Sequence, residues 1–418
     1  MFKFNSSYFC SLSIKVFFQL LLISFISTVF AGNKKRKIPG EIVAHQAVET
    51  NQFIGSPGLC VLPNGSLLVT HDLFGKGSTE FISAQTNVYL SDNKGKKWHQ
   101  IAMIDGQFWS KPFYYNGKLY LIGTDKHHGN LIVRESVDSG HTWSNPVNSQ
   151  SGLISKGEFH CAPTPVIEYQ GYLWKAMERA DGEIKRWGKR YSAFMLSIKV
   201  GDNPLDAKNW RMTNHLPYDS TYLKGKFGAW LEGNAVVGKN GAIYNILRVH
   251  TPADIYEEHA AIVEIADNGA TSIFDEANGF IKFPGGSKKF SVKYDANSKK
   301  YLAIVNYVPK EFRGEIQLDR VRNTQALISS TDLKNWTVHK ILLHHPDRIR
   351  HGFNYIDWEI VGNDIIYLSR TAYDTESEQA KNYHDANFLT FHRLKIYRKS
   401  LRKNIEEFNN NYNTSDKR

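Results

Sequence analysis

The sequence predicts an all-β protein of the β-propeller kind, with six or seven four-stranded blades around one axis. A short turn motif recurs along the chain, and most copies end in tryptophan. Aromatic residues make up 13% of the 418 residues, Gly (31) exceeds Pro (13), and long helical periodicity is missing. This composition favours many short strands joined by tight turns. A repeated unit needs neighbours to bury its faces, and a closed ring supplies them.

The recurring turn is most complete at Ser136–Trp143, which reads Ser-Val-Asp-Ser-Gly-His-Thr-Trp. Ser91–Trp98 and Ser330–Trp336 repeat it with substitutions, and Asp206–Trp210 and Asp267–Ile273 are degenerate copies. Asp and Ser side chains satisfy the backbone of a turn, Gly accepts a positive φ, and Trp fills the space between sheets. Copies about 45 to 67 residues apart therefore predict one hairpin per blade, between its third and fourth strands.

Four strands can be placed around each copy of the turn. In the first unit they lie near Gly58–Leu62, Ser66–His71, Asn87–Leu90 and Trp98–Ile104. The last unit supplies three, near Gly352–Glu359, Asp364–Arg370 and Phe388–Tyr397. Its fourth strand is expected from Glu41–Val48, which would close the ring. We count six blades, and seven if one is cryptic.

The chain divides into three expected segments. Residues 1–31 have the pattern of an export signal, with the apolar run Val16–Phe30 followed by the small residue Ala31; a retained anchor is the alternative. Residues 41–398 form a single propeller domain, because no Pro/Ser-rich linker interrupts them. The polar, Asn-rich segment 399–418 is expected to be disordered. The mature protein is therefore expected to be secreted, extracellular or periplasmic, with no membrane span.

The net charge of +11 favours an anionic partner through long-range attraction. No recognised nucleic-acid-binding module is present, so we expect no nucleic-acid partner, and we expect a monomer. Of the three cysteines, Cys10 is lost with the signal, while Cys60 and Cys161 lie in apolar strand-like runs. Buried thiols are favoured there, with a single disulfide as the alternative.

Polar residues converge on one face of the predicted ring. Because the turn motif lies on one face, the opposite face receives the start of strand one, the end of strand two and the start of strand three of each blade. The residues at those positions include His71, Asp72, Trp109, Lys111, His127, His128, His160, Glu178, Arg179, Tyr191, Trp230, Glu232, Asn234, Arg248, Lys289, His351 and Arg370. This set predicts a basic site near the axis.

Four of these residues are candidates for catalysis. His128 and His160 can act as a general base, since the ordinary pKa of histidine is near working pH; His160 can also be a buried core histidine. Tyr191 can donate a proton or stack on a sugar. Arg248 can bind a carboxylate or sulfate, or form a salt bridge with Glu232. The candidate substrate-binding residues are Arg179, Trp230, Glu232, Asn234, Lys289, His351 and Arg370.

No cofactor is required by this chemistry. His344, His345, His351, His384 and Asp385 gather in the C-terminal part and leave a structural zinc or calcium site open. Their spacing matches no diagnostic pattern of metal ligands.

Several phrases resemble a known family. His160–Pro163, Trp230–Asn234, Pro284–Gly286, Leu343–Asp347 and His384–Asn387 are similar to the sialidase-like (Asp-box) β-propeller family of bacterial polysaccharide-degrading proteins, and in particular to the propeller-type ulvan lyases. The resemblance implies β-elimination on an anionic, uronic-acid-containing, sulfated algal polysaccharide, and a fold of seven blades. His128 or His160 would take the proton, Tyr191 would protonate the leaving oxygen, and Arg248 or Arg179 would offset the carboxylate charge.

Other activities remain open alternatives. The Arg-Ile-Pro motif of sialidases has its nearest match in Lys37-Ile38-Pro39, which lacks the arginine. Glu232 stands where a lyase tyrosine is expected. If Glu232 is catalytic, a glycoside hydrolase becomes the better interpretation, with Glu232 as acid or base and Asp72 or Glu178 as its partner. A non-catalytic glycan-binding propeller is the third possibility.

Overall fold

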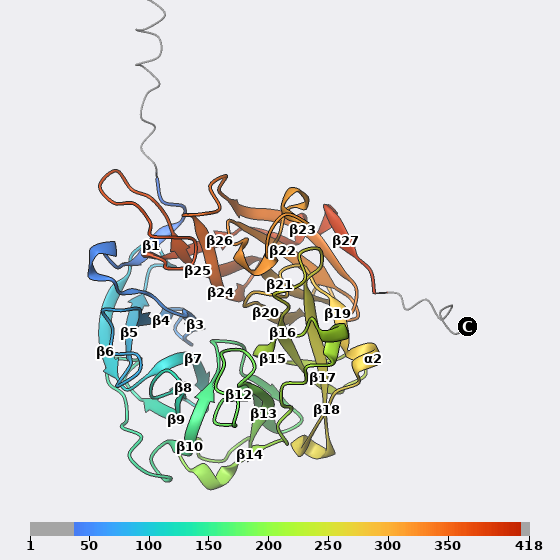
Figure 1. The fold of residues 1–418 in the computed structure, drawn as a ribbon. Helices are drawn as coiled ribbons and strands as arrows, with labels where there is room; N and C mark the ends of the chain where they lie inside the picture. The colour runs from blue at the N-terminus through green and yellow to red at the C-terminus, as the bar shows by residue number, and fades with distance from the viewer. Residues whose placement is uncertain (1–36, 411–418) are drawn as a thin grey trace, which may run out of the picture. The chain divides into compact units, whose positions relative to one another are not determined.

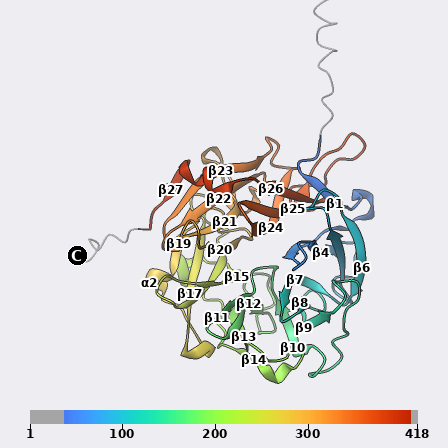
Figure 2. The same ribbon diagram turned by 180° about the vertical axis from the view of Figure 1, so that it is seen from behind.

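The computed structural model describes residues 37–410, and the expected export signal, 1–31, lies outside them. Residues Ile38–Asp374 and the chain from Glu378 onward form one compact unit. Its antiparallel sheets follow one another in chain order around a ring, seen from one side in Figure 1 and from behind in Figure 2. The predicted all-β propeller is therefore confirmed.

Six four-stranded blades account for most strands of residues 37–410. Blades one to three are β3 (Gly58–Val61), β4 (Leu67–Phe74), β5 (Gln85–Ser91), β6 (His99–Asp105); β7 (Phe108–Tyr115), β8 (Lys118–Thr124), β9 (Gly129–Ser136), β10 (Leu153–His160); and β11 (Ile167–Tyr169), β12 (Tyr172–Arg179), β13 (Ser192–Lys199), β14 (Trp210–Met212). Pairing of β10 with β12 joins blades two and three into an eight-stranded sheet.

Blades four to six follow the same plan. They are β15 (Ala229–Val237), β16 (Ile243–His250), β17 (His259–Ala266), β18 (Thr271–Ile273); β20 (Ser291–Asp295), β21 (Lys300–Asn306), β22 (Thr324–Ser330), β23 (Trp336–His344); and β24 (Gly352–Val361), β25 (Asp364–Ala372), β26 (Phe388–Leu394) with β1 (Glu41–His45). β1 pairs with β26, so the first strand closes the last blade as the sequence predicts. β2 (Phe53–Ile54) and β19 (Phe280–Lys282) pair with β4 and β17.

The helices of the described residues are short. They are η1 (Val48–Thr50), η2 (Ala207–Asn209), η3 (Tyr222–Gly225), η4 (Asp267–Gly269), α2 (Glu276–Gly279), η5 (Lys310–Phe312), η6 (Leu318–Arg320) and η7 (Tyr397–Arg402). Across residues 37–410, no helix has the length and apolar character that a membrane crossing needs.

The C-terminal segment is ordered further than its composition suggests. β27 (Glu406–Phe408) adds a fifth strand to blade five by pairing with β23. The carboxylate of Glu406 accepts hydrogen bonds from the Arg313 guanidinium at 2.7 and 2.9 Å and from the Tyr307 hydroxyl at 2.7 Å. The expectation of disorder from residue 399 is therefore wrong up to 410, because strand pairing and a partly buried ion pair hold this polar segment. Residues 411–418 lie outside the described range.

Each predicted turn joins the third and fourth strands of a blade. In Ser136–Trp143, the Asp138 carboxylate accepts the N–H of Thr142 at 2.9 Å, and the Ser136 hydroxyl accepts the N–H of Gly140 at 2.9 Å. The Trp143 indole N–H donates to the carbonyl of Gly140 at 2.9 Å. Ser91–Trp98 and Ser330–Trp336 repeat the indole bond to the turn. The side chains thus satisfy the turn backbone, as the sequence pattern requires.

The core lies between the blades. Trp336 is 1% exposed and packs its ring 4.8 Å from that of Phe283, which precedes blade five. Trp98 of blade one lies 5.3 Å from the ring of Phe391 in blade six. Cys60 and Cys161 are buried free thiols, which confirms the favoured reading of the two cysteines. Adjacent blades therefore share apolar layers, and no blade buries its faces alone.

We expect Trp336→Ala to lower the free energy of unfolding by about 3–5 kcal/mol, because it opens a cavity in a closed interface. Trp143→Ala is the matched control, since it removes the same turn bond from a tryptophan that is only partly buried. Urea unfolding followed by fluorescence measures both. Equal losses would show that the turn bond, and not burial, carries the effect.

Candidate functional site

A cavity of about 250 Å³ opens on the face opposite the Ser-x-Asp turns. It is lined by Gly55, Ser56, Phe74, Glu80, Phe108, Trp109, His127, His160, Trp187, Leu231, Glu232, Tyr355, Arg370 and His384. Most of these residues come from the starts of inner strands, the ends of second strands and the loops after them, in five of the six blades, and His160 ends β10, the fourth strand of blade two. The sequence predicts polar side chains at this face, and the cavity lies there.

Three inner strands reach the cavity through β-bulges. The register of pairing shifts once in β7, once in β15 and once in β24. At each shift a non-glycine residue adopts a left-handed backbone: Trp109 (φ 50°), Glu232 (φ 51°) and Tyr355 (φ 51°). This conformation is unfavourable for bulky side chains and concentrates at functional sites. All three side chains line the cavity, so the bulges direct them there.

Buried polar groups hold the bulges at Trp109 and Tyr355. The Asp72 carboxylate accepts the N–H of Trp109 at 2.9 Å. The Lys289 ammonium donates to the carbonyl of Ile356, the residue after Tyr355. Asp72 and Lys289 are each 1% exposed. These two predicted site residues therefore act on the backbone beneath the cavity.

The bulge at Glu232 is held from both sides. The Asn234 amide donates to the carbonyl of Glu232 at 3.3 Å and accepts the N–H of Val292 in blade five at 3.0 Å. Glu178 of blade three accepts the N–H of Gly233 at 3.1 Å. Because these groups are buried, losing either partner leaves an unsatisfied polar atom at a cost of about 1–3 kcal/mol.

Glu232 forms a buried ion pair with Arg248. Nη1 of Arg248 donates to Glu232 Oε2 at 2.9 Å, and Nε donates to the carbonyl of Ser287 at 2.8 Å. Burial by itself would raise the pKa of Glu232, but the Arg248 guanidinium and the nearby His160 outweigh it and hold the pKa below its ordinary value. Oε1 accepts no hydrogen bond from any described residue. Glu232 thus presents an ionised carboxylate to the cavity.

Glu80 is a second carboxyl group on the cavity wall, in the loop between β4 and β5. Its Oε2 accepts the N–H of Gly75 at 2.7 Å and the Ser78 hydroxyl at 3.2 Å, and its Oε1 lies 3.7 Å from Nδ1 of His127. Burial raises the pKa of Glu80 above its ordinary value. The two carboxyl groups of the cavity therefore have pKa values shifted in opposite directions.

Histidines and Trp109 pack together on one side of the cavity. The Trp109 ring lies 4.5 Å from that of His127 and 4.2 Å from that of His160. Burial lowers the pKa of His127 to about 3 and that of His128 to about 2, so both rings are neutral at neutral pH. Nε2 of His128 shares a hydrogen bond with the Tyr191 hydroxyl at 2.9 Å, and burial raises the pKa of Tyr191.

The structure brings the four catalytic candidates into one neighbourhood. His160 lines the cavity, and its Nδ1 pairs with Glu178 at 2.7 Å. Its ring lies 4.5 Å from that of the fully buried Tyr191. His128, Tyr191 and Arg248 do not line the cavity. Arg248 binds the cavity residue Glu232, Tyr191 packs on the cavity residue His160, and His128 shares a hydrogen bond with Tyr191. The salt bridge offered as an alternative role for Arg248 is present.

Two of the predicted substrate-binding residues, Glu232 and Arg370, line the cavity. Asn234 and Lys289 are buried backbone supports instead. Trp230 is fully buried in the apolar layer of blades three and four, and its indole N–H donates to the Pro217 carbonyl at 2.8 Å. Its side chain therefore belongs to the core and not to a binding surface.

Arg179 and His351 also lie apart from the cavity lining. Nε of Arg179 donates to both carboxylate oxygens of Asp181, at 2.7 and 2.8 Å. His351 is 1% exposed, and its ring stacks on His345 at 3.6 Å. Arg179 thus pairs with a neighbouring carboxylate and His351 packs against another histidine, although their positions along the strands match those of cavity residues.

Glu80, Tyr355 and Trp187 are cavity residues that sequence reasoning misses. The expected carboxylate partners of Glu232 were Asp72 and Glu178, which are 1% and 0% exposed and do not line the cavity. Glu80 and Trp187 lie in loops that follow second strands, which topology assigns to the site face. That position was the available signal, because loop residues follow no hydrophobic period.

The histidine and carboxylate residues of the C-terminal part do not form a metal centre in the structure. Between residues 37 and 410, no group of three or more His, Cys, Asp or Glu residues is arranged to hold a metal ion. The His384 ring instead pairs with Asp385 at 3.0 Å, beside the guanidinium of Arg370.

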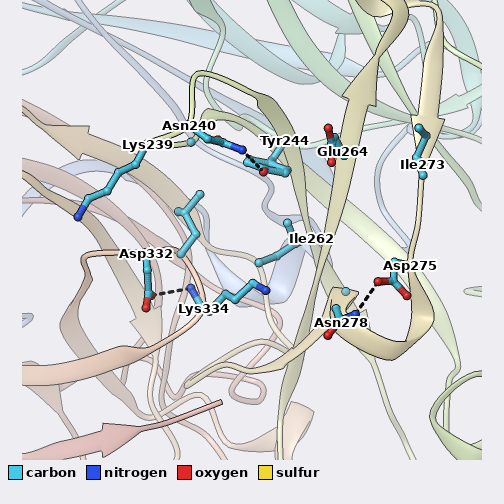
Figure 3. A pocket seen from close by; sticks show the side chains of 13 residues that line it. Lys239, Asn240, Tyr244, Ile262, Glu264, Ile273, Asp275, Asn278, Asp332 and Lys334 are labelled. Carbon is cyan, nitrogen blue, oxygen red and sulfur yellow. Dashed lines mark hydrogen bonds between the residues drawn. The ribbon is translucent and has the colours of Figure 1, made fainter. Parts of the chain in front are cut away.

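A second hollow of about 380 Å³ lies over the turns of blades four and five (Figure 3). Its polar groups serve the turns themselves. Asp332 accepts the N–H of Lys334 at 2.9 Å, and Asn278 donates to Asp275 at 2.7 Å. Asn240 donates to the Tyr244 hydroxyl at 2.9 Å. Because these polar groups already bind other groups of the turns, the hollow gives no argument for a ligand.

Comparison with known proteins identifies the fold. The structure matches a Penicillium chrysogenum alpha-L-arabinanase complexed with arabinobiose (TM-score 0.54, 14% identity, 86% of this chain and 98% of that chain). It also matches the alpha-L-arabinofuranosidase of Fusarium graminearum (0.55, 10%, 86% and 98%) and a Hadza microbial sialidase (0.55, 15%, 86% and 69%). No family model and no curated protein sequence matches the chain. The protein therefore has the sialidase-like β-propeller fold.

We expect Arg248→Met to destabilise the protein by about 3–5 kcal/mol at neutral pH, because it leaves the Glu232 carboxylate buried without its partner. In this variant burial raises the pKa of Glu232 above its unfolded value, so the loss is full at high pH and shrinks as pH falls and Glu232 takes up a proton. Urea unfolding at several pH values measures the trend.

The double variant Glu232→Gln/Arg248→Met is the control for this prediction. It removes both charges, and we expect its loss to be smaller than that of Arg248→Met at neutral pH. Its own stability has no contribution from titration at position 232, so its loss relative to the wild type shrinks only where the wild-type Glu232, whose pKa is lowered, takes up a proton in acid. If single and double variants lose equal stability at every pH, the ion pair is not what holds this wall of the cavity.

Proposed function

We propose that the protein is a glycoside hydrolase that acts after export and cleaves a glycan in the cavity at the ring centre. One observation carries the proposal: Glu80 and Glu232 line the same cavity, and their pKa values are shifted in opposite directions. Two carboxyl groups whose pKa values are shifted apart in one site are the arrangement that glycoside hydrolysis uses, with the raised pKa on the acid and the lowered pKa on the carboxylate.

Glu80 is the general acid in this proposal. Burial raises its pKa, which is the direction that a general acid needs, and Oε2 accepts hydrogen bonds from the N–H of Gly75 and the hydroxyl of Ser78. The proton passes to the glycosidic oxygen as the bond to the anomeric carbon breaks. A carboxyl group with its pKa near the working pH gives up the proton and regains it in each cycle.

Glu232 is the carboxylate on the other side of the reaction. Its Oε1 stabilises the positive charge that develops on the sugar ring and activates the oxygen that replaces the leaving group. Arg248 fixes the carboxylate through Oε2 at 2.9 Å and keeps it ionised. Tyr355, aimed into the cavity by its bulge, places a hydroxyl in the same space. The anomeric configuration of the first product reports whether attack is direct or through an enzyme-bound sugar.

The comparisons support this class of reaction. The matched structures carry the names arabinanase, arabinofuranosidase and sialidase, and the arabinanase holds arabinobiose. These activities belong to those proteins, and they share glycan cleavage on this fold. Because this chain also has two carboxyl groups in one cavity, we propose the same class of reaction for it.

A lyase is the second candidate, favoured by the hydrogen bond between His128 and Tyr191. The pKa of His128, lowered to about 2, makes its ring a weak base for removing a proton beside a carboxylate. Both activities release reducing ends, but only a lyase forms an unsaturated uronyl product that absorbs ultraviolet light. Binding without either signal would indicate a non-catalytic propeller.

We expect Glu80→Gln and Glu232→Gln each to lower kcat by about 10²- to 10⁴-fold, since each removes one of the two acid–base groups. The assay measures reducing ends released from arabinan, sialylated glycans and ulvan. Glu264→Gln, on the exposed hollow of the opposite face, is the matched control and should keep full activity. If either variant stays active and the product is an unsaturated uronyl sugar, the protein is a lyase and the hydrolase proposal is wrong.

The pH profile of the wild type is expected to be bell-shaped. Activity needs Glu80 protonated, so it falls as pH rises through the raised pKa of Glu80. It also needs Glu232 ionised, so it falls as pH drops through the lowered pKa of Glu232. Initial rates across the pH range test this, and Glu80→Gln should lose the alkaline limb only. An unchanged alkaline limb in that variant would assign the acid to another group.

A further inference from the structure

A basic segment of the chain lies on the turn face of the ring, opposite the cavity. Residues 393–403 contain six Lys and Arg residues and no Asp or Glu. β26 is the third strand of blade six, so the chain leaves it on the face of the Ser-x-Asp turns and then forms η7. Tyr397 of η7 is 0% exposed and packs into the apolar layer of blades five and six. The segment is thus anchored on one side and exposed on the other.

Two arginines of this segment form ion pairs with the blades beneath it. Arg393 pairs with Asp364 at 3.2 Å, and Arg398 pairs with Asp295 at 3.1 Å. Nη2 of Arg393 also donates to the carbonyl of Lys94 at 3.4 Å. Lys94 belongs to the Ser-x-Asp turn of blade one, so this turn lies beside the basic segment.

The other cations of the segment and of that turn are exposed. They are Lys94, Lys96, Lys97, Lys395, Lys399, Arg402 and Lys403, and we call these seven residues the basic patch. Within residues 37–410, no carboxylate forms an ion pair with any of them. Asp92 of the same turn is one exposed negative charge beside them, and the patch therefore remains strongly positive.

An isoleucine projects from the surface among these cations. Ile396 has a left-handed backbone (φ 49°, ψ 50°), which is unfavourable for a β-branched residue. Its N–H donates to Oδ1 of Asp364 at 3.0 Å, and the N–H of Tyr397 donates to the carbonyl of Asn363 at 3.2 Å. The Ile396 side chain is 48% exposed. Hydrogen bonds thus hold an apolar side chain in solvent in a strained conformation, and such strain concentrates at functional positions.

We propose that the basic patch and Ile396 dock the protein on an anionic lipid surface. The inference goes beyond the proposed function and does not depend on it. Clusters of about four to eight lysines and arginines are attracted to anionic head groups, and each residue strengthens the attraction by about fivefold. An apolar side chain among them adds contact by entering the boundary between head groups and acyl chains.

The kinds of side chain in the patch favour a lipid surface over an acidic glycan. Six of the seven cations are lysines, which are flexible point charges, whereas the paired donors of arginine suit a single acid group. The arginines beside the patch, Arg393 and Arg398, are already bound by carboxylates of the protein. Tyr397, the aromatic residue of the segment, is buried and offers no ring face to a sugar.

Docking through this surface leaves the cavity accessible. The patch lies on the face of the Ser-x-Asp turns, and the cavity opens on the opposite face. A protein bound to lipid in this way directs its cavity toward the solvent. We therefore expect the bound and the free protein to act equally on soluble glycans.

The test measures sedimentation of the purified protein with vesicles of phosphatidylcholine, with and without phosphatidylglycerol. We expect binding only to the vesicles that contain phosphatidylglycerol, and loss of most of it between about 0.1 and 1 M salt, because salt screens the charges. The triple variant Lys395→Gln/Lys399→Gln/Lys403→Gln should bind roughly 100-fold more weakly. No binding of the wild type to these vesicles overturns the proposal.

Lys76→Gln/Lys156→Gln/Lys224→Gln is the matched control. It removes three exposed lysines outside the patch, so the net charge of the protein changes by the same amount. It should bind the vesicles nearly as the wild type does. If both triple variants lose affinity equally, the net charge of the protein and not the patch attracts the lipid, and the proposal is overturned.

Ile396→Asn separates docking from a structural role of this position. Asparagine accepts the left-handed backbone more readily than isoleucine, so the melting temperature should stay the same or rise. Binding to the vesicles should nevertheless fall by roughly 5- to 20-fold, because an apolar contact is lost. Unchanged affinity in this variant would show attraction by charge alone and would contradict docking into the lipid surface.

Polygalacturonate is the competing probe, a soluble acidic glycan. If it binds through Lys395, Lys399 and Lys403 while the phosphatidylglycerol vesicles do not bind, the patch belongs to an acidic glycan and the proposal is overturned. Glycan cleavage by the wild type and by the patch variant should be equal, since the patch is remote from the cavity. Failure of the proposed hydrolysis therefore leaves the vesicle result unaffected, and failure of docking leaves the hydrolysis result unaffected.

Discussion

The site depends on three strained bulges that buried polar groups hold at the inner ends of alternate blades. Regular pleating would turn successive side chains toward the two faces of a blade, where neighbouring blades cover them. A bulge adds one residue and redirects a side chain into the cavity. Trp109, Glu232 and Tyr355 reach it in this way, with φ near 50°. Asp72, Asn234 and Lys289 compensate the strain through bonds to the backbone.

The supporting hydrogen bonds join neighbouring blades, so the shape of the cavity depends on the closure of the ring. Asn234 of blade four bonds to Val292 of blade five, and Lys289 bonds to Ile356 of blade six. The N-terminal strand β1 completes blade six by pairing with β26. The pKa values of the two carboxyl groups then shift in opposite directions, because Glu232 has a guanidinium partner in hydrogen-bond contact, whereas Glu80 accepts its hydrogen bonds from the neutral groups of Gly75 and Ser78. Packing thus determines the direction in which each pKa is shifted.

Prediction from the sequence worked best where a local pattern has one structural meaning. The turn at Ser136–Trp143 specifies its own hydrogen bonds, so strand order, the turn face and the opposite site face followed from it. Prediction of single site residues was less successful. Trp230 and Glu232 lie two positions apart on β15, yet one is in the core and the other in the cavity. The bulge that begins at Glu232 makes the difference, and no residue pattern in the sequence marks it.

The sequence by itself determined the all-β class, the repeated hairpins, the ring closure by residues 41–45 and the face on which polar groups gather. Tertiary structure alone decided that Glu80 is the second carboxyl group of the cavity and that Arg370 is buried between two aromatic rings. Turns and strand periods are set by contacts between residues close in the chain, and they can therefore be predicted from the sequence. The raised pKa of Glu80 and the position of Arg370 against the rings of Phe74 and Tyr355 arise from burial and from contacts between segments far apart in the sequence, which only the folded ring brings together.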